Sequence, residues 1–278
     1  MVRELDPPLA NKAFVNSALA EGVRADGRGP YDFRSIKITF GSTPGHAEAQ
    51  LGKTRVLARV SCELVRPRPN NPSEGFVKFS THFSPMASPG FEVGRMSDDE
   101  VLVSRMLEKA LRKSRAVDTE GLCVIAGEKV WSIQVDIRVL DHEGNLLDCA
   151  CIAAISALLH FRRPDVTVRG TEVIIHPMDE RNPIPLSVHH IPVCVSFAFF
   201  DGGNLLAVDP SSLEEQVEES SMTMVVNIHR ELCTLSKAGG VPLDMATILR
   251  CSQIAAVKGA EVTELIRAAV NAALSEKR

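Results

Sequence analysis

The chain of 278 residues lacks the features that mark membrane and secreted proteins. It contains no apolar run of 18 or more residues, and residues 1–8 show neither the basic region nor the apolar region of a signal peptide. The chain also has no excess of positive charge, because 35 Asp and Glu residues outnumber 31 Lys and Arg residues, which gives a net charge of −4 and a pI of about 6.1. The sequence therefore predicts a soluble intracellular protein in which any contact with nucleic acid is local.

Signals for disulfides and metals are also missing. The seven cysteines are odd in number and lie mostly within apolar runs, which is typical of reduced thiols in a core. Cys149 and Cys151 form a Cys-Ala-Cys pair that could supply half of a metal site, but the sequence offers no CxxC or HxxxH partner for it. We therefore expect no cofactor and no metal site.

The chain does contain strand and helix patterns, which alternate in blocks. Alternating or β-branched residues predict strands over 36–40, 54–65, 76–83, 122–126, 130–140, 166–175 (a pair), 191–200, 205–208 and 222–235, the last broken near Asn227. Helical spacing and capping residues predict helices over 9–20, 97–114, 210–220 and 241–274, and an apolar helix that Asp148 caps and that ends at Phe161.

This pattern predicts an α+β protein of mixed sheets packed with helices in two layered halves, and neither a Rossmann fold nor a barrel. We expect an N-terminal helical segment over 1–26, a first half over 27–164 and a second half over 165–278. The strongly apolar strand within 193–200 also predicts that the chain associates with a partner.

Several short motifs narrow the fold further. The chain contains DGR at 26–28, LGKTRVL at 51–57, VDTE at 117–120 and VWSIQVD at 130–136. It also contains FRRPD at 161–165, HHIP at 189–192 and SFAFF at 196–200. Together these motifs resemble those of the RNase PH-fold ring subunits of the RNA exosome. The resemblance implies an RNase PH-type fold, of the kind also seen in domain 2 of ribosomal protein S5.

The resemblance also implies an assembly. Six RNase PH-like subunits form a hexameric ring of three heterodimers around a pore that threads single-stranded RNA. The expected partners are other RNase PH-like subunits, S1/KH cap subunits, single-stranded RNA and an associated exoribonuclease, with no membrane. Such a subunit serves rRNA maturation and mRNA turnover in the nucleus, the nucleolus and the cytoplasm.

Active members of this family phosphorolyse RNA from its 3′ end, and the resemblance implies that this chain has lost the groups that do so. In active members a strand ends in a tight glycine turn, a Ser or Thr and an Arg follow, and the next helix points its free N–H groups at phosphate. Gly144 keeps the turn. The lost groups are replaced by Asp98 and Asp99 (an Arg pair), by Asn145 and Leu146 (the Ser/Thr and Arg), and by Ile184 and His190 (two catalytic aspartates). We therefore predict a non-catalytic subunit without catalytic residues.

Two aromatic features have a functional and a structural interpretation. His189 and His190 are adjacent, so in an extended segment only one of them would enter a site, and we favour packing or a subunit contact. Trp131 lies on an alternating strand and is predicted to belong to the core or an interface rather than to stack on RNA.

The positive signal for RNA binding lies on the predicted helix 97–114. Arg105, Lys109 and Arg112 follow at i, i+4 and i+7, which places them within about 60° on one face of an α-helix. In the related inactive archaeal subunit, matching basic residues line the RNA path, and RNA phosphates need only positive charge at a suitable spacing. We predict that these residues bind RNA, with Arg95 as a weaker candidate. The alternative is a solvated face in which Glu108 pairs with Arg112.

Two other functions stay open at this point. An active phosphate-dependent 3′-to-5′ exoribonuclease is the first, and the replaced phosphate ligands argue against it. A structural spacer without RNA contact is the second, and it differs only in whether the basic residues face the pore.

Overall fold

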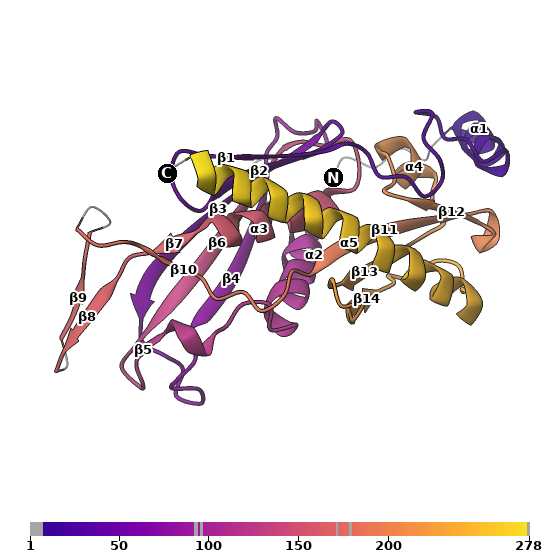
Figure 1. Cartoon of the computed structure of the whole chain (residues 1–278). Coiled ribbons are helices and arrows are strands. Elements are labelled where there is room, and N and C mark those ends of the chain that lie inside the picture. Colours follow the sequence, from indigo (N-terminus) through magenta and orange to yellow (C-terminus); the bar gives the residue numbers. More distant parts are fainter. Residues whose placement is uncertain (1–7, 92–93, 95–96, 171, 178–179, 277–278) are drawn as a thin grey trace.

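The structure is a computed structural model that describes residues 8–91, 94, 97–170, 172–177 and 180–276 (Figure 1). The first half contains α1 (Leu9–Ala20), β1 (Ile36–Phe40), β2 (His46–Leu51), β3 (Thr54–Val65), β4 (Phe76–Phe83), α2 (Asp98–Leu107), η1 (Glu108–Lys113), η2 (Glu120–Leu122), β5 (Cys123–Ile125), β6 (Lys129–Asp141) and α3 (Leu146–His160). The second half contains β7 (Arg162–Arg163), β8 (Val166–Arg169), β9 (Glu172–Ile175), β10 (Ile184–Pro185), β11 (Val193–Phe200), η3 (Asp201–Gly203), β12 (Leu205–Val208), α4 (Ser212–Val217), β13 (Ser220–Val226), β14 (Leu232–Ser236) and α5 (Met245–Glu276).

The first sheet has the strand order β1-β2-β3-β6-β4, and β5 pairs with β6. Its strands pair antiparallel except for β4, which runs parallel to β6. One face is covered by α3, so Ala47 and Ala49 of β2 and Val56 and Ala58 of β3 are fully buried. The alternate residues of these strands are polar, as expected for a sheet with one solvated face. Trp131 of β6 is 2% exposed and belongs to this core, as predicted.

The second sheet has the order β12-β11-β13-β14 and is covered on both faces. Val195, Phe197 and Phe199 of β11 face the core beneath α5, whereas Ala198 and Phe200 pack against α1 and α4. Burial on both faces explains why β11 is apolar throughout. The apolar sequence of β11 is therefore explained by burial within the chain, so this strand is no separate evidence for the expected partner.

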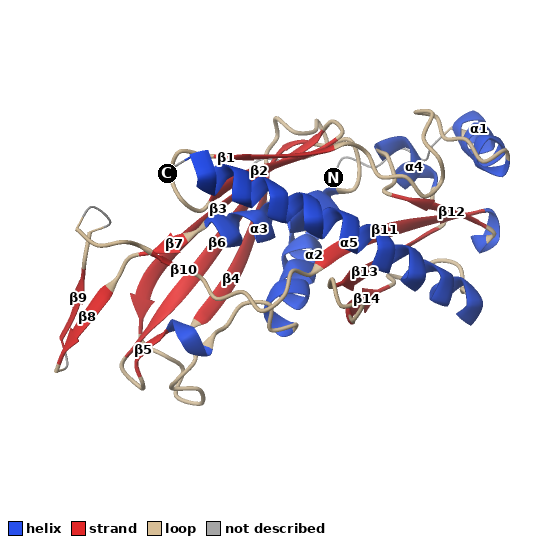
Figure 2. Cartoon of the chain, viewed as in Figure 1, coloured by secondary structure: helices blue, strands red, loops and turns tan. Residues whose placement is uncertain are grey.

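Helix α5 joins the two sheets, and it lies across both of them in Figure 2. Its 32 residues span about 48 Å at 1.5 Å per residue. Cys251 and Ala255 in its first half pack into the core of the second sheet. Val262 and Ile266 in its second half pack into the core of the first sheet, beside α3.

Four expectations about single elements need correction. Strand β2 was not predicted, because its sequence HAEAQL carries only alanines and one leucine on its buried face. The helix expected over 97–114 is α-helical only to Leu107 and continues as the π-helix η1. Asn145, not Asp148, precedes the first residue of α3. The last helix begins at Met245 rather than at 241, because Pro242 disfavours helical geometry in the residue before it.

Replacing Ile266 by alanine should lower the free energy of unfolding by about 2–5 kcal/mol, because the side chain fills the core beneath α5 and is fully buried. Leu265 is the matched control on the same helix and is 49% exposed, so Leu265→Ala should change this free energy by less than about 0.5 kcal/mol. Urea denaturation followed by circular dichroism measures both values. Equal losses in the two variants would contradict the role of α5 in joining the cores.

Candidate nucleic-acid interface and altered phosphate turn

The glycine turn before α3 packs tightly against the second half of the chain. Gly144 has φ +88°, and a Cβ at this position would lie 2.5 Å from the backbone nitrogen of Ser212 and 2.8 Å from the carbonyl oxygen of Pro210. Only glycine fits there. Its carbonyl oxygen accepts hydrogen bonds from Thr54 Oγ1 at 2.7 Å and from Arg34 Nη2 at 3.1 Å. The turn is therefore fixed from both halves.

Carboxylates surround Asn145, the residue that follows the turn. Its backbone N–H donates to Glu215 Oε1 at 2.7 Å, so a carboxylate of α4 takes the place at which an anion would bind. Its side-chain amide donates to Asp209 Oδ1 at 2.7 Å and to Asp148 Oδ2 at 2.8 Å. Because Asn145 is 3% exposed, these contacts are sheltered from water. The N-terminus of α3 therefore already carries the negative charge that its dipole attracts.

Asp209 is the central carboxylate of this cluster and is fully buried. Arg34 donates to it from Nε at 2.9 Å and from Nη2 at 2.7 Å, and the backbone N–H of Arg34 donates at 2.9 Å. Arg28 Nη1 adds a fourth donor at 3.0 Å. Burial alone would raise the pKa of Asp209, but the hydrogen bonds and the charge of Arg34 outweigh it, so the pKa lies below its ordinary value. Asp209 is thus ionised and neutralised within the chain.

The ionised forms of the other two carboxylates near Asn145, those of Asp148 and Glu215, are stabilised less than the ionised form of Asp209. Burial raises the pKa of Asp148 to about 7, although hydrogen bonds from Asn145 and Ser196 oppose the shift. Burial likewise raises the pKa of Glu215 to about 7, against the hydrogen bond from the Asn145 N–H. Neither group is paired directly with a cation among the described residues. Their ionisation near neutral pH therefore works against folding.

The remaining positions of the expected phosphate site carry no basic side chain. Asp98 and Asp99 are exposed in the first turn of α2, where Ser97 and Glu100 form a capping box. Leu146 is half-buried and packs against the first core instead of extending toward solvent. These positions thus offer an anion two carboxylates and an aliphatic side chain.

His190 and Ile184 lie toward the other end of α3. His190 lines a cavity of about 240 Å³ together with His189, Leu159 and Arg267. Ile184 pairs with Arg163 in the short sheet of β10 and β7, just after α3 ends. Residues 189–192 form no regular strand, and both histidines line this cavity. Their role in packing or in a subunit contact stays a prediction.

The predicted RNA-binding residues lie on α2 and η1. Arg105 and Lys109 are exposed. Arg112 is half-buried and pairs with Glu108, Nη1 to Oε1, at 2.6 Å, the ion pair anticipated by the solvated-face alternative. Because η1 has i→i+5 geometry, Arg112 is rotated away from the position that a continuous α-helix would give it. The three cations therefore do not form one regular stripe, and Arg95 lies outside the described residues.

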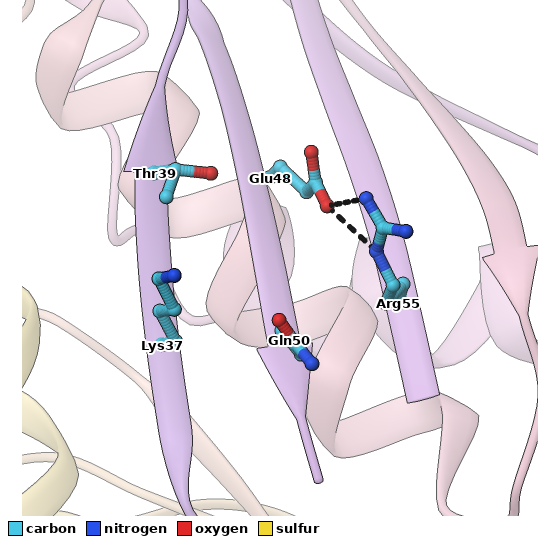
Figure 3. A pocket seen from close by; sticks show the side chains of 5 residues that line it. All are labelled: Lys37, Thr39, Glu48, Gln50 and Arg55. Carbon is cyan, nitrogen blue, oxygen red and sulfur yellow. Dashed lines mark hydrogen bonds and ion pairs between the residues drawn. The ribbon is translucent and has the colours of Figure 1, made fainter. Parts of the chain in front are cut away.

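A further polar surface covers the open face of the first sheet. Lys37 and Thr39 of β1, Glu48 and Gln50 of β2, and Arg55 of β3 line a cavity of about 240 Å³ (Figure 3). Arg55 Nε and Nη2 both donate to Glu48 Oε1, at 2.9 and 2.6 Å. This pairing neutralises the guanidinium, so Lys37 is the cation of this lining that forms no ion pair among the described residues.

Two family models match the chain. One, described as "3' exoribonuclease family, domain 1", covers residues 32–164, and the other, described as "3' exoribonuclease family, domain 2", covers residues 190–258. The chain belongs to this family of RNase PH-like proteins. The predicted α+β architecture and RNase PH-type fold are confirmed.

Relatives of known name agree with the family. "Exosome complex component RRP45" of Danio rerio is 52% identical over 267 residues, which are 95% of this chain and 68% of that protein. "Exosome complex component rrp45" of Schizosaccharomyces pombe is 44% identical over 277 residues, which are 100% of this chain and 95% of that protein. Mammalian relatives of the same name are longer, and the chain spans 61% of their length.

A solved structure described as "archaeoglobus fulgidus exosome with RNA bound to the active site" is similar over most of the molecule. It superposes with a TM-score of 0.81 at 30% identity and covers 92% of this chain and 97% of the other. Among the described residues, no helix is long and apolar enough to cross a membrane, and no three His, Cys, Asp or Glu side chains are placed to hold a metal ion.

The contacts of Asn145 with Asp209 and Glu215 were not predicted from the sequence. These residues follow Asn145 by 64 and 70 positions. One signal was available: the segment 209–218 carries four carboxylates, which is an unusual density beside a buried strand. Residues 210–220 were predicted only as a short acidic helix, and no role was predicted for Asp209.

The contribution of the buried carboxyl groups to the stability of the folded chain should fall as the pH rises from 5 to 8. A buried carboxyl whose pKa is raised from 3.8 to about 7, as for Asp148, contributes stability that is complete below pH 4 and is lost as the pH passes 7. Glu215 adds a loss of the same sign. Asp148→Asn should flatten the dependence by on the order of a few kcal/mol over this range.

The measurement is a series of urea denaturation curves between pH 5 and pH 8. Asp98→Asn, which removes an exposed carboxylate, serves as the control and should leave the slope of stability against pH unchanged. If Asp148→Asn also leaves that slope unchanged, Asp148 does not titrate in this range.

Proposed function

We propose that this chain is the RRP45-type ring subunit of an RNA exosome, the subunit also known as exosome component nine or the smaller polymyositis/scleroderma autoantigen. The identity of 52% over 95% of the chain to the zebrafish protein of that name supports this assignment. In this role the chain joins other RNase PH-like subunits in a hexameric ring, beneath S1/KH cap subunits and beside an associated exoribonuclease. It would act in the nucleus, the nucleolus and the cytoplasm.

The subunit is non-catalytic in this proposal, and the carboxylates around Asn145 carry the argument. A phosphate ion that approached the turn before α3 would find its N–H donor occupied by Glu215. It would also meet the charge of Asp98 and Asp99 instead of two guanidinium groups. Because like charges at contact distance repel by kcal/mol amounts even near a surface, phosphate binding is disfavoured. The matching family models are described as those of 3' exoribonucleases, but the residues around the turn give no support to an active exoribonuclease, the alternative function.

Exposed aliphatic side chains support the assembly. Leu232 and Leu235 on the edge strand β14 are 47% and 43% exposed, and Leu249 and Val257 on α5 are 54% and 56% exposed. Edge strands and apolar surfaces of this kind are commonly covered by partner subunits. Guidance of single-stranded RNA rests on Arg105 and Lys109, which are exposed and, among the described residues, form no ion pair.

The isolated chain should not shorten oligoribonucleotides with phosphate and should not polymerise nucleoside diphosphates. His190→Asp should not create either activity, because it restores one carboxylate but removes none of those around Asn145. Chromatography of the nucleotides released from a labelled oligoribonucleotide measures both reactions, with a mock preparation as control. Phosphate-dependent release of nucleoside diphosphates by the pure chain would show that the turn still binds phosphate.

Replacing Arg105 and Lys109 by glutamate should weaken the binding of single-stranded RNA to the assembled ring. The dependence of affinity on salt should flatten by about 0.7 in logarithmic slope for each lost phosphate contact. The ring should still assemble, because both side chains are exposed. Lys53→Glu with Arg169→Glu applies the same change of charge at exposed positions elsewhere.

Fluorescence anisotropy across a salt series, together with sedimentation of the ring, distinguishes the outcomes. Unchanged affinity and slope would assign Arg105 and Lys109 to a solvated face. Loss of the ring would place them in a subunit interface.

A further inference from the structure

A second basic surface lies away from the altered phosphate turn. The loop between β3 and β4 and the end of η1 enclose a cavity of about 390 Å³, a volume within the usual range for small-ligand sites. The residues that line it are Arg68, Asn71, Glu74, Gly75, Phe76, Val77, Arg112, Lys113, Arg115 and Thr119. Four of these side chains are cationic and one is a carboxylate, in a chain whose net charge is −4.

The two walls of the cavity are the loop between β3 and β4 and the chain at and after the end of η1. Backbone contacts hold these walls together. The N–H of Gly75 donates to the carbonyl oxygen of Thr119 at 2.9 Å. A Cβ on Gly75 would lie 2.4 Å from Leu122 Cβ and 2.6 Å from the carbonyl oxygen of Trp131, so the close approach of the loop requires glycine. The spacing between the cations of the two walls is therefore set by the fold.

Three of the four cations are positioned but not neutralised, whereas Arg112 pairs with Glu108. Arg68 places its guanidinium 5.3 Å from the centre of the Phe76 ring, a cation–π contact that leaves its charge in place. Among the described residues, Arg68, Lys113 and Arg115 form no ion pair. Glu74, the one carboxylate of the lining, accepts a hydrogen bond from Asn71 at 2.8 Å. The contrast is the cavity of Figure 3, where Glu48 neutralises Arg55.

The helix dipole explains only part of this cluster. Lys113 and Arg112 lie in the last turn of η1, where cations interact favourably with the C-terminal carbonyl groups. Arg68 comes from a separate loop and gains nothing from that dipole, yet it lines the same cavity. Cations from two elements that converge in a concave site focus positive potential into it. Such a site attracts a ligand with several negative charges.

We propose that this cavity binds the phosphodiester backbone of single-stranded RNA, at a site distinct from the turn before α3. The inference rests on the proposed function and extends it. It adds Arg68, Lys113 and Arg115 to the RNA-binding surface, and it keeps Arg112 in that surface as part of the cavity lining. Backbone phosphates fit better than bases, because the guanidinium of Arg68 already lies over the Phe76 ring, which is therefore not free to stack on a base.

The test compares the full chain, alone and within the assembled ring, with the double variant Lys113→Glu, Arg115→Glu. Affinity for a fluorescent oligoadenylate should fall roughly tenfold or more, and the logarithmic salt slope should flatten by about 1.4 for two lost phosphate contacts. Lys113→Gln with Arg115→Gln should give a smaller loss in the same direction. Lys53→Glu with Arg169→Glu is the control with the same change of net charge and should have little effect.

Two further measurements identify the ligand: competition by inorganic phosphate, and crosslinking to a photoreactive oligoribonucleotide. Crosslinks should map to the peptides that contain Arg68 and Arg115, and inorganic phosphate should compete only weakly, because one ion cannot contact both walls at once. RNA affinity equal to that of the control variant would overturn the inference. So would a variant that loses a partner subunit while its isolated chain binds RNA normally, since the cavity would then be a protein interface.

This inference and the proposed function can fail separately. If RNA binding falls in the Arg105→Glu, Lys109→Glu variant but not in the Lys113→Glu, Arg115→Glu variant, the proposed function stands and the cavity is rejected as an RNA site. An isolated chain that binds RNA through the cavity but joins no ring would keep the cavity and reject the assembly.

Discussion

The buried carboxylate of Asp209 is the contact on which the arrangement of the molecule depends. It follows β12 in the second half of the chain, and it accepts hydrogen bonds from Arg28 and Arg34 before the first sheet and from Asn145 at the start of α3. Removing one partner of a buried ion pair typically costs about 3–5 kcal/mol, because the remaining charge loses its compensation. The same contact therefore fixes the N-terminal segment, the glycine turn and the second sheet relative to one another.

This stabilising role opposes the binding of a phosphate ion at the same turn. A helix N-terminus attracts anions through free N–H groups and a positive dipole. At α3 the N–H of Asn145 is already bonded to Glu215, and the side-chain amide is divided between Asp209 and Asp148. The chain supplies its own anions from the second half. Replacing His190 or Leu146 by the residue that active members carry leaves these internal anions in place.

Local patterns were sufficient for much of the fold but not for the site. The bounds of α1, β3, β4 and β12 follow from periodicity and turn residues, which are local. The π-helical geometry of η1 was not predicted, because the spacing of apolar residues within 97–114 fits a continuous α-helix. The partners of Asn145 also come from distant sequence. The sequence shows that Asn145 stands where active members carry a Ser or Thr, but it does not show which carboxylates Asn145 contacts.

Charge is graded along the helix that carries the predicted RNA contacts. The first turn of α2 holds Asp98, Asp99 and Glu100, whereas Arg105 and the cations of η1 lie toward the other end. Acidic groups at a helix N-terminus and basic groups at its C-terminus both complement the helix dipole, so the gradient stabilises the fold whether or not RNA is present. A polyanion near this helix is repelled from the acidic end and attracted to the basic one. In the proposed RNA-guiding role, we expect this gradient to favour RNA contact at the basic end of the helix.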